Sequence, residues 1–379
     1  MKVALLFGAW SIGHRPLAFN SLMSSDRGLT GSEIGIALVA KEMAKSGHDV
    51  HLFTVHFGEK PDSWEGVNLH HAHEIHTGLD ASYDAVISWS EPDLLRYASA
   101  SSVRVCYQML NDWSYCIEGF HDVTDIFITV SHLLKQHITS PEKMKYPSLE
   151  KWNVVPLGCS PELYEDNRVP GRIVWTSSAD RGLMNLLEIF PAVKKEVPEA
   201  SLKIFYHFQY GDILKMEPHD RSNHPHVVEM GQRLRYSLEA IKRLKPLGVE
   251  HVGSVSRDKM VKELNEASVF AFPFSGVAFT EGYSCSTLES LASFTVPVIS
   301  DGDCLGEVYN DSGAIVVKSP IRQNLKEYTS EVIRALKDKD HADKVIAKCR
   351  AFAQEHTWEN TSDKILNIIQ SHEKHKTHK

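Results

Sequence analysis

Two glutamates, Glu281 and Glu289, have the residue type and the spacing that binding of a polar ligand would require. Small residues lie between them, among them Gly282 and Ser284, and these let backbone amides approach a ligand closely. Each carboxylate accepts several hydrogen bonds, so one acid at the entry of a loop and a second eight positions later suit a ligand rich in hydroxyl groups. Residues 274–300 are therefore predicted to form a polar binding loop and the elements behind it.

Two apolar segments flank this loop and indicate how it would be positioned. Residues 268–272 and 296–299 have the character of buried strands, and the stretch around Glu289 has that of a helix. In a parallel sheet, ligands bind in the crevice beyond the carboxyl ends of the strands. A helix that begins there directs its free N–H groups at whatever lies in front of it. We therefore expect the loop to lie at the ligand-binding edge of a sheet.

The same alternation of apolar segments and helical stretches runs through the whole chain. A helix is expected from Thr30, which has capping-box spacing to Glu33, and another from Leu183, with Pro191 inside it. Charged amphipathic helices follow from Gln323 onward. Alternating strands and helices predict an α/β fold with doubly wound parallel sheets. The expected strands are residues 3–7, 50–55, 85–89, 103–107, 125–130 and 152–156, and then 172–176, 202–206, 249–252, 268–272, 296–299 and 314–317.

The alternation restarts after residues 159–171, a stretch rich in proline, glycine and charge that we interpret as an interdomain linker. Two similar halves joined in this way predict a central cleft faced by the ligand-binding edges of both sheets. Within the second half, residues 211–226 are expected to form a surface loop. Residues 233–245 are interpreted as a basic, solvated helix face.

Composition excludes several classes of protein. The 379 residues suffice for two domains, and the mixture of apolar and charged residues is that of a soluble globular chain. A formal net charge of −8 argues against nucleic acid as a partner and leaves at most peripheral membrane contact. No apolar run is long enough to cross a bilayer, and residues 1–7 are interpreted as a first strand rather than a signal peptide. Six scattered cysteines fit reduced thiols, so we expect a cytoplasmic protein.

In this order and spacing, the motifs resemble those of glycosyltransferases with two Rossmann-like domains (the GT-B architecture), and within them the retaining group called family 4, or glycosyl transferases group 1. Glu281-Gly-Tyr-Ser-Cys-Ser-Thr-Leu-Glu289 with Pro297-Val-Ile is similar to the family's Glu-x7-Glu element and the strand behind it. Gly31-Ser-Glu33 resembles its N-terminal glycine-loop helix. Ser177-Ser-Ala-Asp-Arg181-Gly resembles the loop that grips the donor diphosphate, and Thr357-Trp358-Glu359 resembles the start of a C-terminal helix that returns to the first domain.

The resemblance implies a retaining, hexosyltransferase-type glycosyltransferase (EC 2.4) that moves a sugar from a UDP- or GDP-linked donor to a sugar, lipid, protein or other acceptor. It implies an acceptor-side domain at residues 1–160, a donor domain at 161–356 and the returning helix with a polar tail at 357–379. Glu281 would hold the donor sugar, Arg181 the diphosphate and Glu289 the ribose, the first two being catalytic. No cofactor is implied besides the nucleotide-sugar co-substrate. The donor-binding residues would be Gly31, Ser32, Arg181, Gly282, Tyr283, Ser284, Cys285, Ser286, Thr287 and Glu289.

Two regions depart from the family's pattern. Its diphosphate loop usually carries two cations, and here Arg181 alone is evident. Many members place a histidine near the acceptor, where this chain has Gln108, Asn111 and Asp112, which are the acceptor-side candidates. No clear Asp-x-Asp metal pair was recognised, so we expect a metal-free reaction in which Arg181 and helix N-termini stabilise the leaving phosphate.

Other functions stay open on a similar architecture. An NAD-dependent oxidoreductase would need Gly-x-Gly-x-x-Gly, whereas Gly8 and Gly13 follow the first strand. A sugar-nucleotide epimerase, a phosphorylase and a catalytically inactive nucleotide-sugar-binding protein are further alternatives, although no cofactor lysine for a phosphorylase is recognised. Residues 70–76 contain four histidines, which we interpret as surface residues rather than metal ligands. Cys285 is interpreted as a small packing residue, because a catalytic cysteine needs a base beside it.

Overall fold

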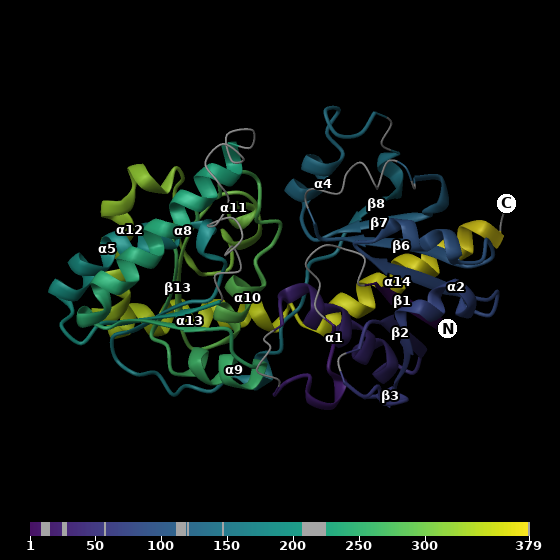
Figure 1. Cartoon of the computed structure of the whole chain (residues 1–379), viewed down its shortest axis with the longest axis horizontal. Coiled ribbons are helices and arrows are strands. Elements are labelled where there is room, and N and C mark those ends of the chain that lie inside the picture. Colours follow the sequence, from purple (N-terminus) through teal and green to yellow (C-terminus); the bar gives the residue numbers. More distant parts are fainter. Residues whose placement is uncertain are drawn as a thin grey trace. The chain divides into compact units, whose positions relative to one another are not determined.

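The structure is a computed structural model that describes residues 1–8, 16–24, 29–56, 58–110, 119, 121–145, 148–206 and 225–377, without the side chains of 225 and 373–377. The described residues divide into two compact units. Unit 1 contains the chain up to Gly158 together with the chain from His356 onward, and unit 2 contains Cys159–Glu355. In Figure 1, the purple and blue elements of unit 1 are therefore joined by the yellow helix α14 (Trp358–Thr377).

Unit 1 is built on a sheet whose eight described strands follow the order β3-β4-β2-β1-β5-β6-β7-β8. Neighbouring strands are parallel except β3 and β4. The apolar runs predicted as strands suit this position, because strands covered on both faces lack polar alternation. The strands are β1 (Lys2–Phe7), β2 (Asp49–Thr54), β3 (Ser63–Trp64), β4 (Val67–His71), β5 (Ala85–Trp89), β6 (Val103–Gln108), β7 (Ile126–Thr129) and β8 (Trp152–Val154).

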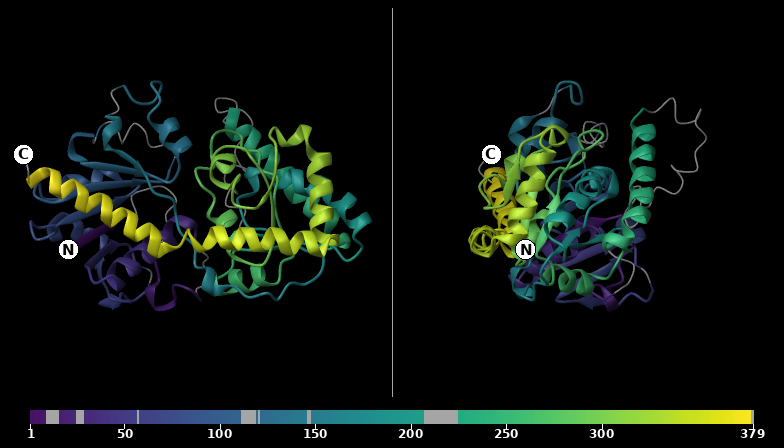
Figure 2. Two further views of the ribbon diagram at one scale, coloured as in Figure 1. Left: turned by 180° about the vertical axis from the view of Figure 1, so that it is seen from behind. Right: turned by 90° about the vertical axis from the view of Figure 1, so that its left-hand side faces the viewer.

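The helices of unit 1 include both an early and a late segment of the chain. Helix α1 (Gly31–Lys45) begins as predicted, with the Thr30 backbone N–H donating to the Glu33 carboxylate at 2.5 Å. Helix α14 packs against α1, and Figure 2 shows it running across the strands of unit 1. The remaining described helices are α2 (Ile75–Gly78), α4 (His132–Ile138) and the 3-10 turns η1 (Phe19–Ser21), η2 (Ala72–Glu74), η3 (Pro92–Tyr97), η4 (His121–Val123) and η5 (Leu149–Lys151).

Unit 2 is built on a wholly parallel sheet whose six described strands follow the order β11-β10-β9-β12-β13-β14. The sequence of the strands reverses direction between β9 and β12, which makes this the switch point of a doubly wound sheet. The strands are β9 (Arg172–Trp175), β10 (Ser201–Phe205), β11 (Val249–Gly253), β12 (Val269–Phe272), β13 (Val296–Ser300) and β14 (Ile315–Val317). The predicted fold of two doubly wound parallel sheets is confirmed.

The helices of unit 2 differ from the predicted ones in two places. Of residues 211–226, expected to form a surface loop, 211–224 lie outside the described residues, and Pro225 and His226 begin a helix instead. A helix after β11 was not predicted. The described helices are α5 (Leu183–Glu196), α8 (Pro225–Leu244), α9 (Arg257–Asn265), α10 (Cys285–Ala292), α11 (Leu305–Tyr309), α12 (Leu325–Lys337), α13 (Lys339–Gln354) and the 3-10 turns η6 (Pro161–Leu163), η7 (Ala179–Arg181), η8 (Lys245–Leu247) and η9 (Ile321–Gln323).

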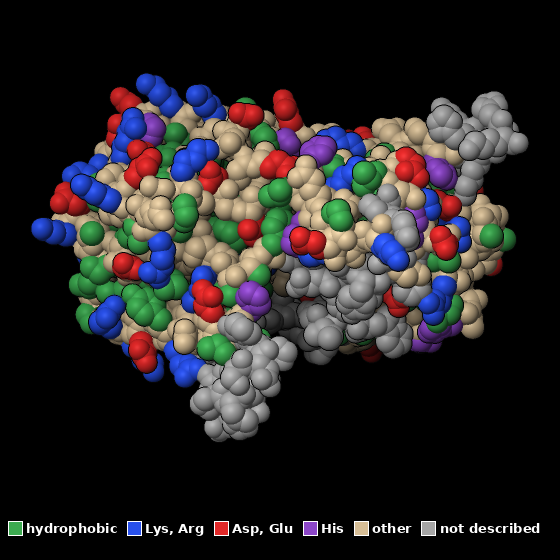
Figure 3. All heavy atoms as spheres, turned by 90° about the horizontal axis from the view of Figure 1, so that it is seen from above, with side chains coloured by type: hydrophobic (Ala, Val, Ile, Leu, Met, Phe, Trp, Pro, Cys, Tyr) green, Lys and Arg blue, Asp and Glu red, His purple; other side chains and the backbone are tan. Residues whose placement is uncertain are grey.

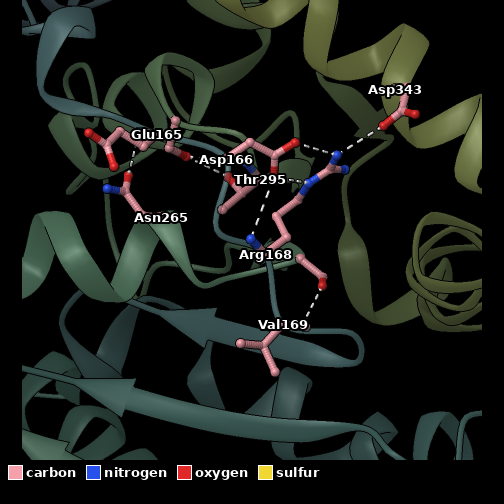
Figure 4. A network of polar contacts seen from close by, with 9 residues as sticks. Glu165, Asp166, Arg168, Val169, Asn265, Thr295 and Asp343 are labelled. Atoms are coloured by element: carbon pink, nitrogen blue, oxygen red, sulfur yellow. Dashed lines mark hydrogen bonds and ion pairs between the residues drawn. The ribbon is translucent and has the colours of Figure 1, made fainter.

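Residues 159–171, interpreted above as an interdomain linker, are instead bonded into unit 2. Figure 4 shows Arg168 between two carboxylates, with Nε donating to Asp166 Oδ1 at 2.8 Å and Nη2 to Asp343 Oδ1 at 3.0 Å. The backbone N–H of Val169 donates to the carbonyl oxygen of Glu266 at 2.9 Å. Because β9 and β12 begin just after these residues, the network lies at the amino edge of the sheet, opposite its ligand-binding edge.

The surface carries charges of both signs. On the face drawn in Figure 3, basic and acidic side chains are interspersed. Among the helices that the structure describes, none is both long and apolar enough to span a membrane.

Candidate functional site

The switch point of unit 2 brings together two loops that are far apart in the sequence. Strands β9 and β12 are parallel neighbours, so the loops that follow Trp175 and Phe272 leave the sheet side by side at its carboxyl edge. The first loop contains Arg181 and the second contains Glu281. In open α/β sheets, this crevice is where ligands bind.

Glycine at position 182 allows the two loops to come into contact. Gly182 has a φ of +114°, and a Cβ there would lie 2.3 Å from the carbonyl oxygen of Pro273 and 2.8 Å from the amide nitrogen of Ser275. That Ser275 N–H donates to the carbonyl oxygen of Arg181 at 3.1 Å. The side-chain amide of Asn185, in the first turn of α5, donates to the Pro273 carbonyl oxygen at 3.1 Å. Only glycine fits this approach, which fixes the start of α5 against the second loop.

The two predicted catalytic residues form an ion pair. Arg181 Nη1 donates to Glu281 Oε2 at 2.7 Å. The Glu281 side chain is 6% exposed, whereas that of Arg181 is 31% exposed and so reaches solvent at the carboxyl edge of the sheet. Burial raises the pKa of Glu281 above its ordinary value, and the charge of Arg181 opposes that rise. An acid one hundred positions away thus depends on Arg181 for its compensating charge.

The loop that carries Glu281 is held by residues that follow β13. Asp303 Oδ2 accepts from the backbone N–H groups of Thr280 at 2.8 Å and of Glu281 at 3.0 Å. The hydroxyl of Tyr309 donates to the carbonyl oxygen of Ser284 at 2.9 Å. Ser284 itself has a φ of +74°, which a non-glycine residue adopts only when its surroundings hold it there. The loop is therefore built into the fold, as a preorganised site requires.

The other predicted donor-binding residues of the loop that carries Glu281 divide into buried and partly exposed ones. The hydroxyl of Ser284 caps α10 by accepting from the backbone N–H of Thr287 at 3.3 Å. Burial raises the pKa of the Cys285 thiol far above its ordinary value, so the thiol is protonated at neutral pH. This agrees with a packing role for that cysteine. Tyr283, Ser284 and Thr287 are buried, and Gly282, Cys285 and Ser286 are partly exposed.

The second acid of the motif is already paired. Glu289, on α10, forms an ion pair through Oε1 with Arg257 Nη1 at 2.5 Å. Arg257 is the first residue of α9, whose cap is Ser256. Its Nη2 also donates to the hydroxyl of Tyr164 at 3.3 Å. The sequence analysis singled out neither Arg257 nor Tyr164.

In unit 1, the predicted donor residues begin helix α1. Gly31 and Ser32 form its first turn, and the hydroxyl of Ser32 is buried without a partner among the described residues. The switch point of this sheet lies between β1 and β5, where the backbone N–H of Gly8 donates to a carboxylate oxygen of buried Glu91 at 2.6 Å. Glu91 was not predicted, although an acid that directly follows a buried strand is a signal that could have found it.

The acceptor-side candidates are only partly described. Gln108 ends β6 and is buried, its Nε2 donating to the carbonyl oxygen of Leu110 at 2.5 Å. Its Oε1 has no partner among the described residues. Asn111 and Asp112 lie outside the described residues.

Comparison with known proteins places the fold. No family model and no curated protein sequence matches the chain. Solved structures do. Sucrose-phosphate synthase from Thermosynechococcus elongatus aligns with 98% of this chain and 99% of its own, at 14% identity and a TM-score of 0.66. A glycosyltransferase from Rickettsia africae covers 98% of both chains at 13% identity and a TM-score of 0.65.

A third similar structure contains a nucleotide. TarM from S. aureus, solved in complex with UDP, aligns with 78% of this chain and 57% of its own, at 12% identity and a TM-score of 0.58. The fold is the GT-B fold of glycosyltransferases. At identities this low, the similarity shows the fold of the chain alone.

On this GT-B fold, α8 contributes a cation that sequence reasoning misjudged. Arg233 was interpreted as part of a solvated helix face, which is wrong, because its side chain is 15% exposed. Its Nη1 donates to the carbonyl oxygens of Asp180, at 3.2 Å, and of Ser275. Its Nη2 donates to Glu229 at 2.6 Å. Arg233 thus joins the two switch-point loops, a long-range role for which no sequence signal exists.

An Asp-x-Asp sequence, Asp301-Gly302-Asp303, follows the loop that carries Glu281, and the sequence analysis overlooked it. The two carboxylates have different partners. Asp301 pairs with Lys318 Nζ at 3.1 Å and accepts from the Ser319 backbone N–H at 2.5 Å, whereas Asp303 accepts from the backbone of Thr280. The motif could have been found from its spacing.

The histidine-rich segment forms a bonded cluster in unit 1. His51 Nδ1 and His70 Nε2 share a hydrogen bond of 2.8 Å, and His56 Nε2 donates to the carbonyl oxygen of His70 at 2.9 Å. His73 and His76 are exposed. Among the described residues, no group of three or more His, Cys, Asp and Glu side chains is arranged to hold a metal ion.

Proposed function

We propose that this protein is a retaining, hexosyltransferase-type glycosyltransferase (EC 2.4) that transfers a sugar from a nucleotide-diphosphate sugar to an acceptor without a metal ion. The observation that carries the proposal is the Arg181–Glu281 pair at the switch point of unit 2, on a GT-B fold. The fold supplies a nucleotide-binding architecture. The pair supplies a cation for phosphate and an acid for sugar hydroxyls in one place.

Arg181 is suited to receive the donor diphosphate. It stands immediately before Gly182 and α5, whose first-turn N–H groups and helix dipole favour an anion. The diphosphate would compete with Glu281 for the guanidinium, and each charge-assisted hydrogen bond to phosphate contributes about 1.5–3 kcal/mol. As the glycosidic bond breaks, negative charge grows on the β-phosphate, and a fixed cation stabilises that charge.

Glu281 would then be available to the sugar. Its carboxylate, held by the Asp303 anchor and nearly buried, accepts hydrogen bonds from donor hydroxyls and sets the position of the anomeric carbon. In a retaining reaction of this kind, the leaving phosphate takes the proton of the acceptor hydroxyl on the same face. No protein nucleophile is required, which agrees with the protonated thiol of Cys285. UDP- or GDP-linked donors and a cytoplasmic location are part of the proposal.

A nucleotide-sugar-binding protein without transferase activity, or an epimerase, is the alternative. The observation that favours it is the single cation in the loop 177–182, since Arg181 has to serve both Glu281 and the diphosphate. A second cation near the phosphate would make catalysis stronger. Transfer activity therefore decides between the two functions, whereas nucleotide binding alone does not.

The test is a donor panel of UDP-, GDP- and ADP-sugars, assayed for hydrolysis and for transfer to sugar and lipid acceptors. Release of nucleoside diphosphate is expected with at least one donor, and NMR of the product should show retention. Absence of binding to every nucleoside diphosphate would refute the proposal. Binding without turnover would favour the alternative. Activity should survive EDTA, and its loss there would overturn the metal-free mechanism.

Two matched glutamate variants locate the chemistry. Glu281→Gln should lower kcat by about a hundredfold, because it removes a preorganised charge next to the reacting sugar. Glu263 is the control, since it also is a little-exposed glutamate of unit 2 that accepts from a cation, Lys203 Nζ, at 2.7 Å. Glu263→Gln should leave kcat unchanged. Equal effects in the two variants would mean that Glu281 acts only through stability.

A further inference from the structure

Arg257 is a buried cation that neither the motif nor the proposed reaction uses. It starts α9, directly after β11, so its backbone lies at the carboxyl edge of the unit 2 sheet. Helix α10, which carries Glu289, starts from the same edge after β12. The side chain of Arg257 is 11% exposed. A buried arginine at the ligand-binding edge of a sheet calls for a function of its own.

Arg257 contacts one carboxylate oxygen of Glu289, and the other oxygen has no such contact. Nη1 forms an ion pair with Glu289 Oε1 at 2.5 Å, and Nη2 donates to the hydroxyl of Tyr164 at 3.3 Å. Tyr164 is itself buried and belongs to the segment that precedes β9. Among the residues that the structure describes, no hydrogen bond to Oε2 of Glu289 occurs, and the glutamate keeps 16% exposure. Oε2 is therefore the oxygen that a ligand can reach.

The electrostatics of this pair keep Arg257 charged. Burial opposes the charge of Arg257, but Glu289 and Tyr164 outweigh it and hold the pKa of the guanidinium above its ordinary range. A nearly buried arginine cannot lose its proton, so Arg257 presents a permanent positive charge to Glu289. A carboxylate beside such a charge accepts hydrogen bonds from a ligand. Such an acceptor suits a hydroxyl donor and rejects another acceptor.

We propose that Arg257 is a positioning residue for Glu289, fixing its carboxylate through Oε1 so that Oε2 accepts from the ribose hydroxyls of the donor nucleotide. The inference rests on the proposed function, which assigns the ribose to Glu289. It adds that the ribose preference of this protein depends on a side chain from α9 that does not contact the nucleotide. Tyr164 holds the guanidinium from its other side.

The experiment compares ribose with 2′-deoxyribose. UDP, GDP and ADP and their 2′-deoxy counterparts are titrated into the full-length protein by calorimetry, with inorganic pyrophosphate as a probe of the diphosphate half alone. Loss of one hydrogen bond to a charged acceptor should weaken binding of the deoxy form to the wild type by roughly ten- to a hundredfold. We call the Kd of the deoxy form divided by that of the ribose form the ribose to deoxyribose ratio. In Glu289→Gln and in Arg257→Lys, this ratio should fall to about one to three. Pyrophosphate affinity should stay unchanged.

Arg168→Lys is the matched control. Arg168 also contacts two partners within unit 2, Asp166 and Asp343, but at the amino edge of the sheet (Figure 4). Its substitution should leave the ribose to deoxyribose ratio as in the wild type. A merely structural effect of replacing a buried arginine would lower affinity for all probes together and would not change this ratio.

The outcomes separate the two proposals. If no nucleotide binds the wild type, the proposed function fails and this inference with it. If Glu289→Gln abolishes the ribose preference but Arg257→Lys retains it, the inference alone is overturned. It is also overturned if Arg257→Lys weakens the binding of pyrophosphate as much as the binding of the nucleotides. Should Arg257→Lys not fold, the double variant R257M/E289Q leaves no charge unpaired. A ratio equal to that of E289Q supports the inference, and a still lower ratio overturns it.

Discussion

Replacing Arg181 by alanine tests the central ion pair through stability. The variant leaves Glu281, whose side chain is 6% exposed, without its compensating charge. The buried carboxylate can avoid that cost by taking up a proton, so protonation sets the maximum. A carboxyl with the ordinary pKa of 4.5 lies 2.5 pH units below pH 7. At 1.36 kcal/mol per unit, protonating it at pH 7 costs about 3 kcal/mol, which is the largest stability loss expected for the variant. Breaking a buried ion pair costs about the same, 3–5 kcal/mol.

The loss should depend on pH in a definite direction. The folded-state pKa of Glu281 is raised, so the stability that its protonated form provides is complete below the ordinary value of 4.5 and is lost as the pH rises through the folded value. At pH 5, half a unit above 4.5, the difference between Arg181→Ala and the wild type should therefore shrink to under about 1 kcal/mol. Glu281→Gln should cost less than about 1 kcal/mol at either pH, because the partly exposed Arg181 stays solvated.

Hydrogen exchange of peptides from β12 and β13 is the suitable assay, because it reports the opening of unit 2 separately from unit 1. At pH 7, Arg181→Ala should lower their protection factors by roughly a hundredfold, and the double variant R181A/E281Q should restore them. Equal losses at pH 5 and pH 7, or no loss at pH 7, would refute the reasoning, since Glu281 would then not be a buried, paired carboxylate.

Three further changes have defined outcomes. Gly182→Ala should destabilise unit 2 by about 1–3 kcal/mol, measured by urea denaturation, because the new Cβ would meet Pro273 and the φ of +114° is strained for alanine. Arg233→Ala should raise hydrogen exchange in residues 273–282 and raise KM for the donor more than it lowers kcat, because the two loops lose their common contact. Burial lowers the pKa of His51 and of His56. The stability that these two neutral histidines give unit 1 should therefore be complete above pH 6.5, their ordinary pKa, and be lost as the pH falls through their pKa values in the folded protein.

Each of these expectations has a control or an outcome that would contradict it. For Gly182, the control is Gly253→Ala. A Cβ at position 253 meets nothing within 4 Å, so this variant should lose only the smaller free energy that a positive φ costs alanine. Unchanged exchange after Arg233→Ala would contradict the bridging role. Six of the seven tryptophans lie outside residues 159–355, so fluorescence melting follows mainly unit 1. A melting temperature that is the same at pH 5.5 and 7.5 would exclude the histidine effect.

The sheets could be predicted from the sequence because their strands are buried on both faces. Residues 85–89 are then apolar except for Ser88, and this signal is local. Helix α9 escaped prediction for the opposite reason. Among its residues only Leu264 is a buried large apolar side chain, so its sequence has too few apolar residues to indicate a packed helix. A helix held by its end contacts leaves little trace in composition.

The candidate site was predictable as far as its topology and no further. Arg181 and Glu281 each follow a strand, and parallel neighbours place the two loops at one edge. The hydrogen bonds of Arg233 and the pairing of Arg257 with Glu289 depend on how long side chains cross between helices and loops. No local pattern encodes such distances. Gln108 was singled out by the resemblance, directly after the predicted strand 103–107, and it is the last residue of β6. Its hydrogen bonding depends on the loop that follows.

The return of the chain to unit 1 has a consequence for its synthesis. Trp358, Ile365 and Ile369 of α14 are buried, and the Trp358 ring lies against Gly35 of α1. Unit 1 therefore cannot cover α1 until about 300 further residues have been translated, roughly 15–60 s at 5–20 residues per second. Unit 2 is one continuous stretch and is complete earlier. On the ribosome, the domain that is begun second is expected to fold first, while the apolar side of α1 waits for the last helix of the chain.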